Sequence, residues 1–126
     1  MILDAGVLVA LYRDEPDAKD FIEAARLEGE PLRTTAPVVA QVWLDGSRQA
    51  RLSRFLPALD VRPFTTAHMS LVGTLLRHSG ASDVVDAHLL ACAIHLDDTI
   101  ITSDLDDFTR LTAHRGEAKP QAQHWH

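Results

Sequence analysis

The sequence has little cysteine: Cys92 is its only one among 126 residues. A single thiol excludes a disulfide framework within the chain and any zinc cluster built from cysteines. The residues around Cys92 are apolar, which predicts a small buried hydrophobe without redox chemistry. The seven histidines show no metal-ligand spacing: His88 and His95 lie seven positions apart with no third ligand, and we interpret them as partly buried structural groups.

Long hydrophobic runs are also missing. The longest uninterrupted apolar stretch, residues 6–12, is far shorter than the roughly 20 residues that span a bilayer. No basic segment precedes an apolar core of the kind found in signal peptides. We therefore expect a soluble protein of the cytoplasm with no membrane association.

The chain lacks an excess of positive charge, since its formal net charge is -6. Such a charge argues against attraction of the whole surface to nucleic acid or anionic lipid. Local charge is different, because Arg48, Arg51 and Arg54 fall within one short segment. This segment is interpreted either as a patch that binds acidic groups of a partner, or as a solvated helix face.

With 46% hydrophobic and 24% charged residues, the composition is that of a globular protein rather than a disordered one. The length fits one domain, residues 1–126, large enough to bury roughly two-thirds of its unfolded surface. No internal repeat, low-complexity tract or linker interrupts it. We expect a single domain.

Short apolar segments alternate with longer amphipathic ones. Strands are predicted at residues 2–4, 32–34, 61–64 and 99–102, and helices at residues 5–12, 16–30, 36–43, 48–55, 65–78, 83–96 and 105–114. Residues 117–126 are interpreted as a last short strand or a disordered tail. Strands separated by helices imply right-handed crossovers and a parallel sheet covered on both faces, which is an α/β fold.

Acidic residues gather at one predicted edge of this sheet. Asp4 follows the first strand directly, and Asp104 follows the fourth, so both lie where parallel sheets bind ligands. Asp83 and Asp86 lie three positions apart in the first turn of one helix and so share a face. The residues four and seven positions after Asp86 are apolar, which predicts that its carboxylate points inward.

No lysine or arginine lies near these four acids in the sequence, so the cluster would repel itself unless a cation joined it. Mg²⁺ or Mn²⁺ is the natural counter-charge, because both prefer carboxylate oxygens. Such metals activate water for phosphodiester hydrolysis. Each acid also has a structural interpretation: Asp4 ends a strand, Asp83 complements a helix dipole and Asp104 caps a helix.

Four segments together resemble a known family. They are I-L-D-A-G-V-L-V-A-L, A-P-V-V-A-Q-V-W, S-D-V-V-D-A-H-L-L-A and I-I-T-S-D-L-D-D-F, and they span nearly the whole chain. In order and spacing they are similar to the PIN domain, in particular to VapC-type toxins of bacterial toxin–antitoxin pairs. The resemblance implies a three-layer α/β/α sandwich, a Mg²⁺- or Mn²⁺-dependent endoribonuclease acting on RNA, a homodimer, and inhibition by a VapB-like antitoxin.

The resemblance assigns the catalytic and metal-ligating roles to Asp4, Asp86 and Asp104. It adds Asp83 and Asp107 at positions where the family often carries further acids. The three main acids are those that the edge of the predicted sheet had already singled out.

Two departures from the family pattern stand out. Gln41 occupies the position of a glutamate that the family usually carries, and Asp45, one turn further along the same face, is a candidate substitute. The Thr or Ser that often follows the first acid is absent. Thr102 and Ser103 lie near the same edge as supporting hydroxyl groups.

Two other function classes stay open. One is a catalytically weakened PIN-like domain that binds RNA or antitoxin only, which the uncharged Gln41 and the negative net charge favour. The other is a phospho-acceptor receiver domain, similar in length and alternation. A receiver needs a lysine after a late strand, whereas Lys19 lies in the second predicted helix and Lys119 in the tail.

An interrupted helix suggests how the chain associates. Phe55, Leu56 and Leu59 follow it, and we expect them near the surface. In a chain this small, a second subunit would cover them, which is a second reason to expect a homodimer.

Overall fold

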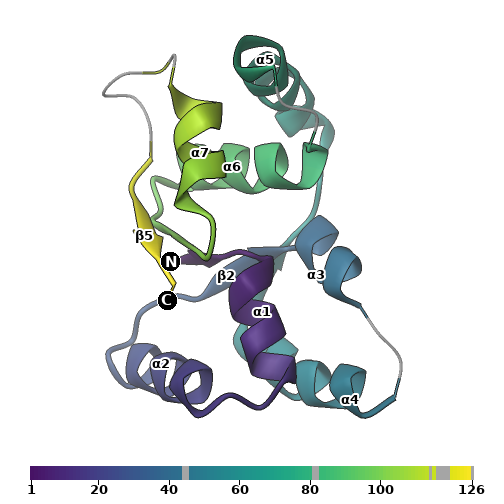
Figure 1. The fold of residues 1–126 in the computed structure, drawn as a ribbon, viewed down its shortest axis with the longest axis vertical. Coiled ribbons are helices and arrows are strands. Elements are labelled where there is room, and N and C mark those ends of the chain that lie inside the picture. Colours follow the sequence, from purple (N-terminus) through teal and green to yellow (C-terminus); the bar gives the residue numbers. More distant parts are fainter. Residues whose placement is uncertain (44–45, 81–82, 114, 116–119, 126) are drawn as a thin grey trace.

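The computed structural model describes residues 1–43, 46–80, 83–113, 115 and 120–125. Five parallel strands form one central sheet in the order β3-β2-β1-β4-β5 (Figure 1). The strands are β1 (Ile2–Leu3), β2 (Arg33–Thr35), β3 (Asp60–Arg62), β4 (Ile100–Thr102) and β5 (Ala122–His124). Chain progression runs outward from β1 to β2 and β3, then returns to β4 on the other side. The neighbours β1 and β4 therefore flank the point where the strand order reverses.

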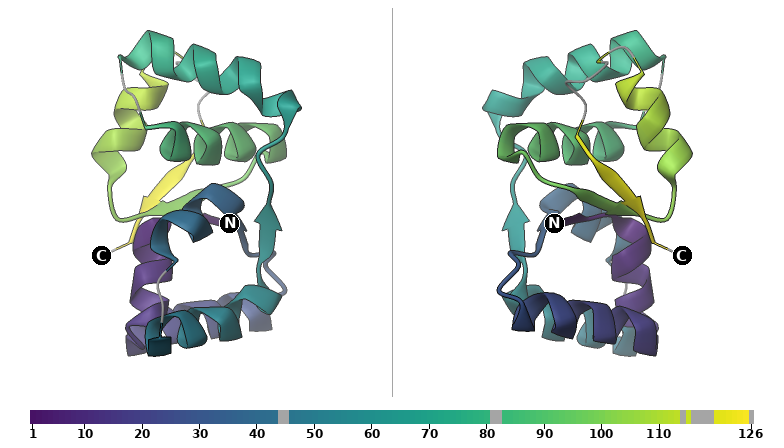
Figure 2. Two further views of the ribbon diagram at one scale, coloured as in Figure 1. Left: turned by 90° about the vertical axis from the view of Figure 1, so that its right-hand side faces the viewer. Right: turned by 90° about the vertical axis from the view of Figure 1, so that its left-hand side faces the viewer.

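Helices cover both faces of the sheet, which confirms the predicted three-layer α/β/α sandwich. The helices are α1 (Ala5–Tyr12), α2 (Pro16–Leu27), α3 (Ala36–Val42), α4 (Gly46–Phe55), α5 (Met69–Ser79), α6 (Val84–Leu96) and α7 (Leu105–Thr112), with short 3-10 turns η1 (Leu56–Ala58) and η2 (Thr66–His68). Figure 2 shows α5, α6 and α7 on one side of the strands and α2 and α4 on the other. Within the described residues, no helix has the length and apolarity needed to cross a membrane.

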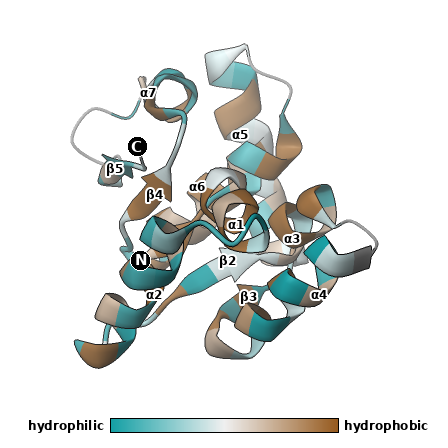
Figure 3. Cartoon of the chain, turned by 60° about the horizontal axis from the view of Figure 1, so that its bottom comes forward, coloured by the Kyte–Doolittle hydropathy of each residue, from teal (hydrophilic) through white to brown (hydrophobic). Residues whose placement is uncertain are grey.

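Helix α6 forms the centre of one helical layer. Every residue from 87 to 93 is buried, so the helix is enclosed on all sides rather than along one stripe. A helix that is apolar all round has no face to offer water, and α5, α7 and α3 pack around it. Figure 3 shows this contrast between apolar α6 and the more hydrophilic α4.

Local sequence signals explain several helix ends. The Thr35 hydroxyl accepts a hydrogen bond from the backbone N–H of Val38 at 3.2 Å, with Pro37 in the same first turn, as the sequence predicts. Gly80 ends α5 with a positive φ of 71°, a conformation that glycine adopts without strain. The predicted helix at 65–78 begins instead as η2, because Thr65 and His68 form a capping box.

The C-terminal part of the chain follows one of the two predicted alternatives. Residues 122–124 form β5, which pairs with β4 from Ile100 to Thr102. Trp125 is buried and its ring makes an edge-to-face contact with Phe21 of α2. A strand and a buried aromatic side chain therefore attach this end to the sheet.

The expected surface position was wrong for Leu59, which is buried at 8% exposure. Phe55, the last residue of α4, and Leu56 are partly buried and pack against the chain's own core. The reason is η1, which turns the chain back toward the sheet just before β3. These side chains no longer argue for a homodimer, which stays a prediction from the resemblance.

Candidate active site

Asp4 lies at the carboxyl end of β1, next to β4. It is the N-cap of α1, and its Oδ1 accepts a hydrogen bond from the backbone N–H of Gly6 at 2.8 Å. Its own N–H donates to the carbonyl of Ile101 at 3.1 Å, which fixes the end of β1 against β4. The sheet therefore holds this carboxylate at the reversal of strand order, where open α/β sheets bind ligands.

The residues that follow β4 hold the second oxygen of Asp4. Oδ2 accepts hydrogen bonds from the hydroxyl of Thr102 and from the backbone N–H of Ser103, the latter at 3.3 Å. Thr102 is fully buried, and its hydroxyl also accepts from the N–H of Asp104 at 2.9 Å. Asp4 is only 7% exposed, and this burial raises its pKa against the lowering effect of its hydrogen bonds.

The missing hydroxyl after the first acid has a structural counterpart. A Cβ atom at Gly6 would lie 2.2 Å from Oγ and 2.8 Å from Cβ of Ser103. The Ser103 side chain therefore occupies the space that a side chain at position 6 would need. Gly6 and Ser103 fit each other, and a hydroxyl reaches this edge from β4 instead of α1.

Asp86 faces a pocket at the start of α6. The pocket has a volume of about 290 Å³ and is lined by Ser79, Gly80, Asp83, Asp86, Asp107, Arg110 and Leu111. Burial, together with the negative charges of Asp83, Asp107 and Asp4, raises the pKa of Asp86 to about 7. The predicted inward orientation is consistent with its half-buried position, and the structure brings four of the predicted acids into electrostatic contact.

Two of the predicted acids also cap helices. The Oδ1 of Asp83 accepts from the N–H of Asp86 at 3.1 Å, and the Oδ1 of Asp104 accepts from the N–H of Asp107 at 3.2 Å. The structural interpretation of Asp104 as a cap is thus confirmed. Contact between the Asp104 and Asp107 carboxyl groups raises the pKa of Asp107. Asp104 therefore lies next to an acid that lines the pocket.

One charged residue of this pocket was not predicted from the sequence. Arg110 lines it, and its guanidinium group forms an ion pair with the Asp107 carboxylate. The statement that no basic residue lies near the acids therefore needs correction. The signal was present, because side chains three positions apart on a helix are neighbours.

The donor chemistry of the pocket fits a hard divalent ion. Three carboxyl groups, of Asp83, Asp86 and Asp107, line it against the one guanidinium group of Arg110, and carboxylate oxygens are ligands that such ions prefer. Among the residues that the structure describes, the acids do not form a tight set of three donors within 4.8 Å of one another.

Gln41, which replaces the usual glutamate of the family, lies outside the described lining of the pocket. Gln41 is exposed on α3 and is not among the described residues that line the pocket. Asp45, its candidate substitute, lies outside the described residues. A supporting role for either residue stays a prediction.

The arginine segment is partly built into the fold. On α4, Arg51 donates a hydrogen bond to the backbone carbonyl of Tyr12 at 3.1 Å, and the Arg48 guanidinium lies 5.9 Å from the centre of the Tyr12 ring. Arg54 is exposed. Tyr12 ends α1 and Asp4 begins it, so these arginines lie at the other end of α1 from the acids (Figure 1).

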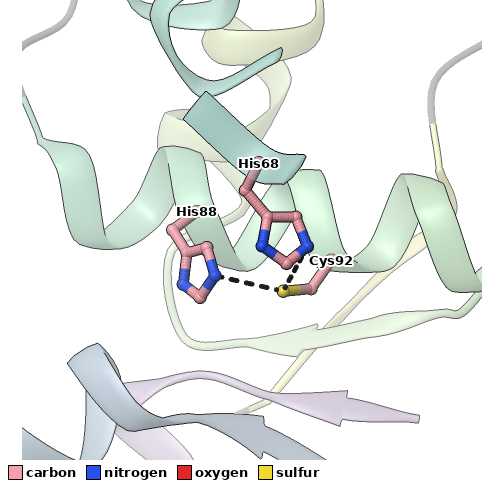
Figure 4. Close-up of side chains that lie close together, drawn as sticks. All are labelled: His68, His88 and Cys92. Atoms are coloured by element: carbon pink, nitrogen blue, oxygen red, sulfur yellow. Dashed lines mark hydrogen bonds between the residues drawn. The ribbon is translucent and has the colours of Figure 1, made fainter. Parts of the chain in front are cut away.

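The histidine interpretation was wrong in one respect. His68 of η2 meets His88 and Cys92 of α6, and both histidine Nε2 atoms face the Cys92 sulfur (Figure 4). A third ligand-type side chain therefore does exist. The spacing of His88 and Cys92, four positions apart on one helix, was the part of this cluster that the sequence could reveal.

A sequence profile of the PIN domain matches residues 1–113. The chain belongs to the PIN domain family. PIN domains are nucleases that generally use divalent metals, which agrees with the acidic edge described above. The coarse expectation of a nuclease is confirmed at the level of the family.

Solved structures show the same fold. VapBC2 from Rickettsia felis bound to a promoter DNA fragment aligns with a TM-score of 0.79 at 18% identity, covering 99% of this chain and 98% of that one. FitAB bound to a DNA fragment gives 0.74 at 18% identity over 99% and 95%. FitAcB from Neisseria gonorrhoeae gives 0.70 at 17% identity over 96% and 94%. No curated protein sequence matches this PIN domain.

Proposed function

We propose that this PIN domain is a Mg²⁺- or Mn²⁺-dependent endoribonuclease, the toxin of a VapBC-type toxin–antitoxin pair. The observation that carries the proposal is Asp86. Its carboxyl group faces a pocket that Asp83 and Asp107 also line, and the charges of these two acids and of Asp4 act on it. Such a cluster of carboxyl groups is suited to a divalent cation. The reaction is hydrolysis of RNA phosphodiester bonds.

The residues divide into ligands and supports. Asp4, Asp86 and Asp104 would hold the ion, with Asp83 and Asp107 as additional acids. The ion, when bound, lowers the pKa of a water ligand and stabilises the attacking and leaving oxygens of the phosphodiester.

The supporting residues fix these acids. Thr102 and the N–H of Ser103 hold Asp4 by donating to Oδ2. Arg110 brings a positive charge to the pocket that Asp83, Asp86 and Asp107 line. There its guanidinium group can contact a phosphate oxygen of the substrate as well as Asp107. Gln41 and Asp45 are proposed as further oxygen donors.

We assign the control of this activity to a VapB-like antitoxin in the cytoplasm, and the active assembly to a homodimer. Three of the similar structures are VapBC2, FitAB and FitAcB, the first two bound to DNA, and another is a toxin–antitoxin complex from Klebsiella pneumoniae. The exposed arginines of α4, Arg48 and Arg54, offer a site for an acidic segment of the antitoxin or for RNA phosphates.

The experiment measures cleavage of a labelled single-stranded RNA by the purified chain with EDTA, Mg²⁺ or Mn²⁺. Asp86→Asn should lower the metal-dependent rate at least about 100-fold, because a catalytic metal supplies several kcal/mol and each 1.4 kcal/mol is about tenfold. Asp106→Asn is the matched control. Asp106 is an exposed acid in the first turn of α7 that does not line the pocket.

Two outcomes would count against the proposal. Cleavage that persists in EDTA, or that falls equally in both variants, contradicts a metal site at Asp86. RNA binding without cleavage in either metal would instead support the weakened binding module that Gln41 suggests. DNA of the same sequence tests the preference for RNA.

A further inference from the structure

A second group of potential metal ligands lies deeper in the helical layer. Nε2 of His88 is 3.4 Å from Sγ of Cys92, and Nε2 of His68 is 3.8 Å from the same sulfur (Figure 4). Their three ligand atoms all lie within 4.8 Å of one another. His88 and Cys92 are almost completely buried, whereas His68 is half-buried and forms the outer side of the group.

These separations match a transition-metal site. With a Zn–S bond of about 2.3 Å and a Zn–N bond of about 2.0–2.1 Å, tetrahedral nitrogen and sulfur ligands lie about 3.5 Å apart. The donors are two imidazoles and one thiol, with no carboxylate among the three. Such a set selects zinc over Mg²⁺, which prefers oxygen ligands.

We infer that His68, His88 and Cys92 bind one Zn²⁺ ion at a site separate from the acidic pocket. The ion would join η2 to the second and third turns of α6. Its role is structural, because it would link two elements that otherwise meet through side-chain packing. A fourth position would remain for water or for His95, whose ring stacks on His68 with 5.2 Å between centres.

The second nitrogen of each imidazole is compatible with this role. In the capping box, Nδ1 of His68 accepts from the Thr65 backbone N–H at 3.4 Å, which places the ring proton on Nε2. Metal binding through Nε2 would therefore move this proton to Nδ1, where it can be donated to the Thr65 hydroxyl at 3.2 Å in place of the capping-box bond. Nδ1 of His88 is buried and makes no regular hydrogen bond within the described residues, although the Pro63 carbonyl is near enough to favour a proton on the ring. An imidazole without a strong partner is free to present Nε2 as a ligand.

Metal binding requires one of the three ligands, the Cys92 thiol, to lose its proton. Imidazoles bind metal ions in their neutral form, which is the main form of an ordinary histidine at pH 7. Burial raises the pKa of the Cys92 thiol to about 11. Binding therefore breaks the S–H bond, forms a Zn–S bond and releases one proton to solvent for each ion.

The test uses Co²⁺ as a spectroscopic substitute for Zn²⁺ on the full chain after removal of metals by a chelator. Excess Mg²⁺ is present to occupy oxygen-donor sites. Because Cys92 is the only cysteine, a thiolate-to-cobalt charge-transfer band can arise from no other residue of the chain. We expect this band to saturate at one Co²⁺ per chain and to disappear when Zn²⁺ is added.

Variants locate the site. His68→Ala should weaken Co²⁺ binding at least about tenfold, since even residues that only orient metal ligands contribute 10–100-fold. His78→Ala, an exposed histidine on α5, is the matched control and should bind as the parent does. Cys92→Ala should remove the band while a small apolar side chain keeps the core filled.

The absence of a charge-transfer band would overturn the inference, and so would a band that His68→Ala leaves unchanged. If Cys92→Ala fails to fold, the half-buried His68 variant still decides the matter. The acidic pocket plays no part in this signal, so the result is independent of nuclease activity.

Discussion

The start and the middle of α6 carry opposite kinds of chemistry. At its start, Asp83 and Asp86 border a pocket, and their charges repel one another. In its second and third turns, His88 and Cys92 are buried and uncharged at neutral pH. The same helix therefore presents hard anionic oxygens to water and soft neutral donors to the core.

This difference teaches how burial selects the cation. A cluster of carboxylates pays an electrostatic cost until a divalent ion arrives, so metal binding should stabilise it strongly. The His68–His88–Cys92 cluster has no charge to neutralise. The acids should respond to pH and hard metals, whereas the histidines and cysteine should respond to zinc.

The largest effect is expected beside Asp4, from Gly6→Ala in the first turn of α1. The added Cβ would meet the Cβ of Ser103 at 2.8 Å, which no rotation of the Ser103 hydroxyl can relieve. Overpacking of this kind should cost about 3 kcal/mol in the free energy of unfolding. Urea denaturation with circular dichroism measures it.

The controls for this change are a second glycine and a compensating variant. Gly73 in α5 has open space around its missing Cβ, so Gly73→Ala should stabilise the chain by up to about 1 kcal/mol. Adding Ser103→Gly should restore most of the stability that Gly6→Ala removes. Equal effects of the two Ala variants would show that Gly6 and Ser103 do not make this contact.

A second test uses pH to distinguish the contributions of Asp86 and His88 to stability. The pKa of Asp86 rises on folding from 3.8 to about 7, so its folded form keeps a proton and stability falls as pH rises through this range. The pKa of His88 falls from 6.5 to about 4, so its unfolded form takes up a proton and stability falls as pH decreases through that range. The two contributions oppose each other between about pH 4 and 6.5.

A variant that lacks one of these two groups should show the pH dependence of stability that the other contributes. In metal-free buffer at pH 8, Asp86→Asn should raise the free energy of unfolding by about 2 kcal/mol, a figure discounted for solvent screening of a half-buried group. His88→Leu should leave a chain whose stability decreases from pH 4 to 7. Parallel stability curves for the parent and both variants would contradict the assigned shifts.

Sequence reasoning predicted the positions of the acids far better than it predicted the His68–His88–Cys92 cluster, for a physical reason. Asp4 and Asp104 follow strands, and parallel strands place their carboxyl ends at one edge whatever the packing details are. The meeting of His68 with α6 depends on how η2 packs, which no local pattern specifies. The buried position of Leu59 has the same origin, because a single 3-10 turn decides which way the chain faces.

A third and smaller effect concerns α4. Arg51→Ala removes a hydrogen bond to the Tyr12 carbonyl and should cost about 1 kcal/mol in unfolding free energy. Arg54→Ala, an exposed neighbour on the same helix, should change stability little. For binding of RNA or antitoxin, charge reversal of Arg54 should weaken affinity more at low salt than at high salt. Affinity unaffected by salt and by this change would remove the patch from the proposed function.

The smallest expected effect on stability tests Gln41. Because Gln41 is exposed, Gln41→Glu should change the metal-free unfolding free energy by less than about 0.5 kcal/mol. If position 41 nevertheless reaches the bound ion, the added carboxylate should increase the stabilisation by Mn²⁺ and the rate of RNA cleavage, since it adds an anionic oxygen ligand. Thermal unfolding with and without Mn²⁺ measures the first quantity. Gln49→Glu, at a partly buried amide on α4, is the control and should show neither gain. A Gln41→Glu variant whose response to Mn²⁺ equals that of the parent would place position 41 away from the ion, and ion binding would then depend on Asp4, Asp86 and Asp104 alone.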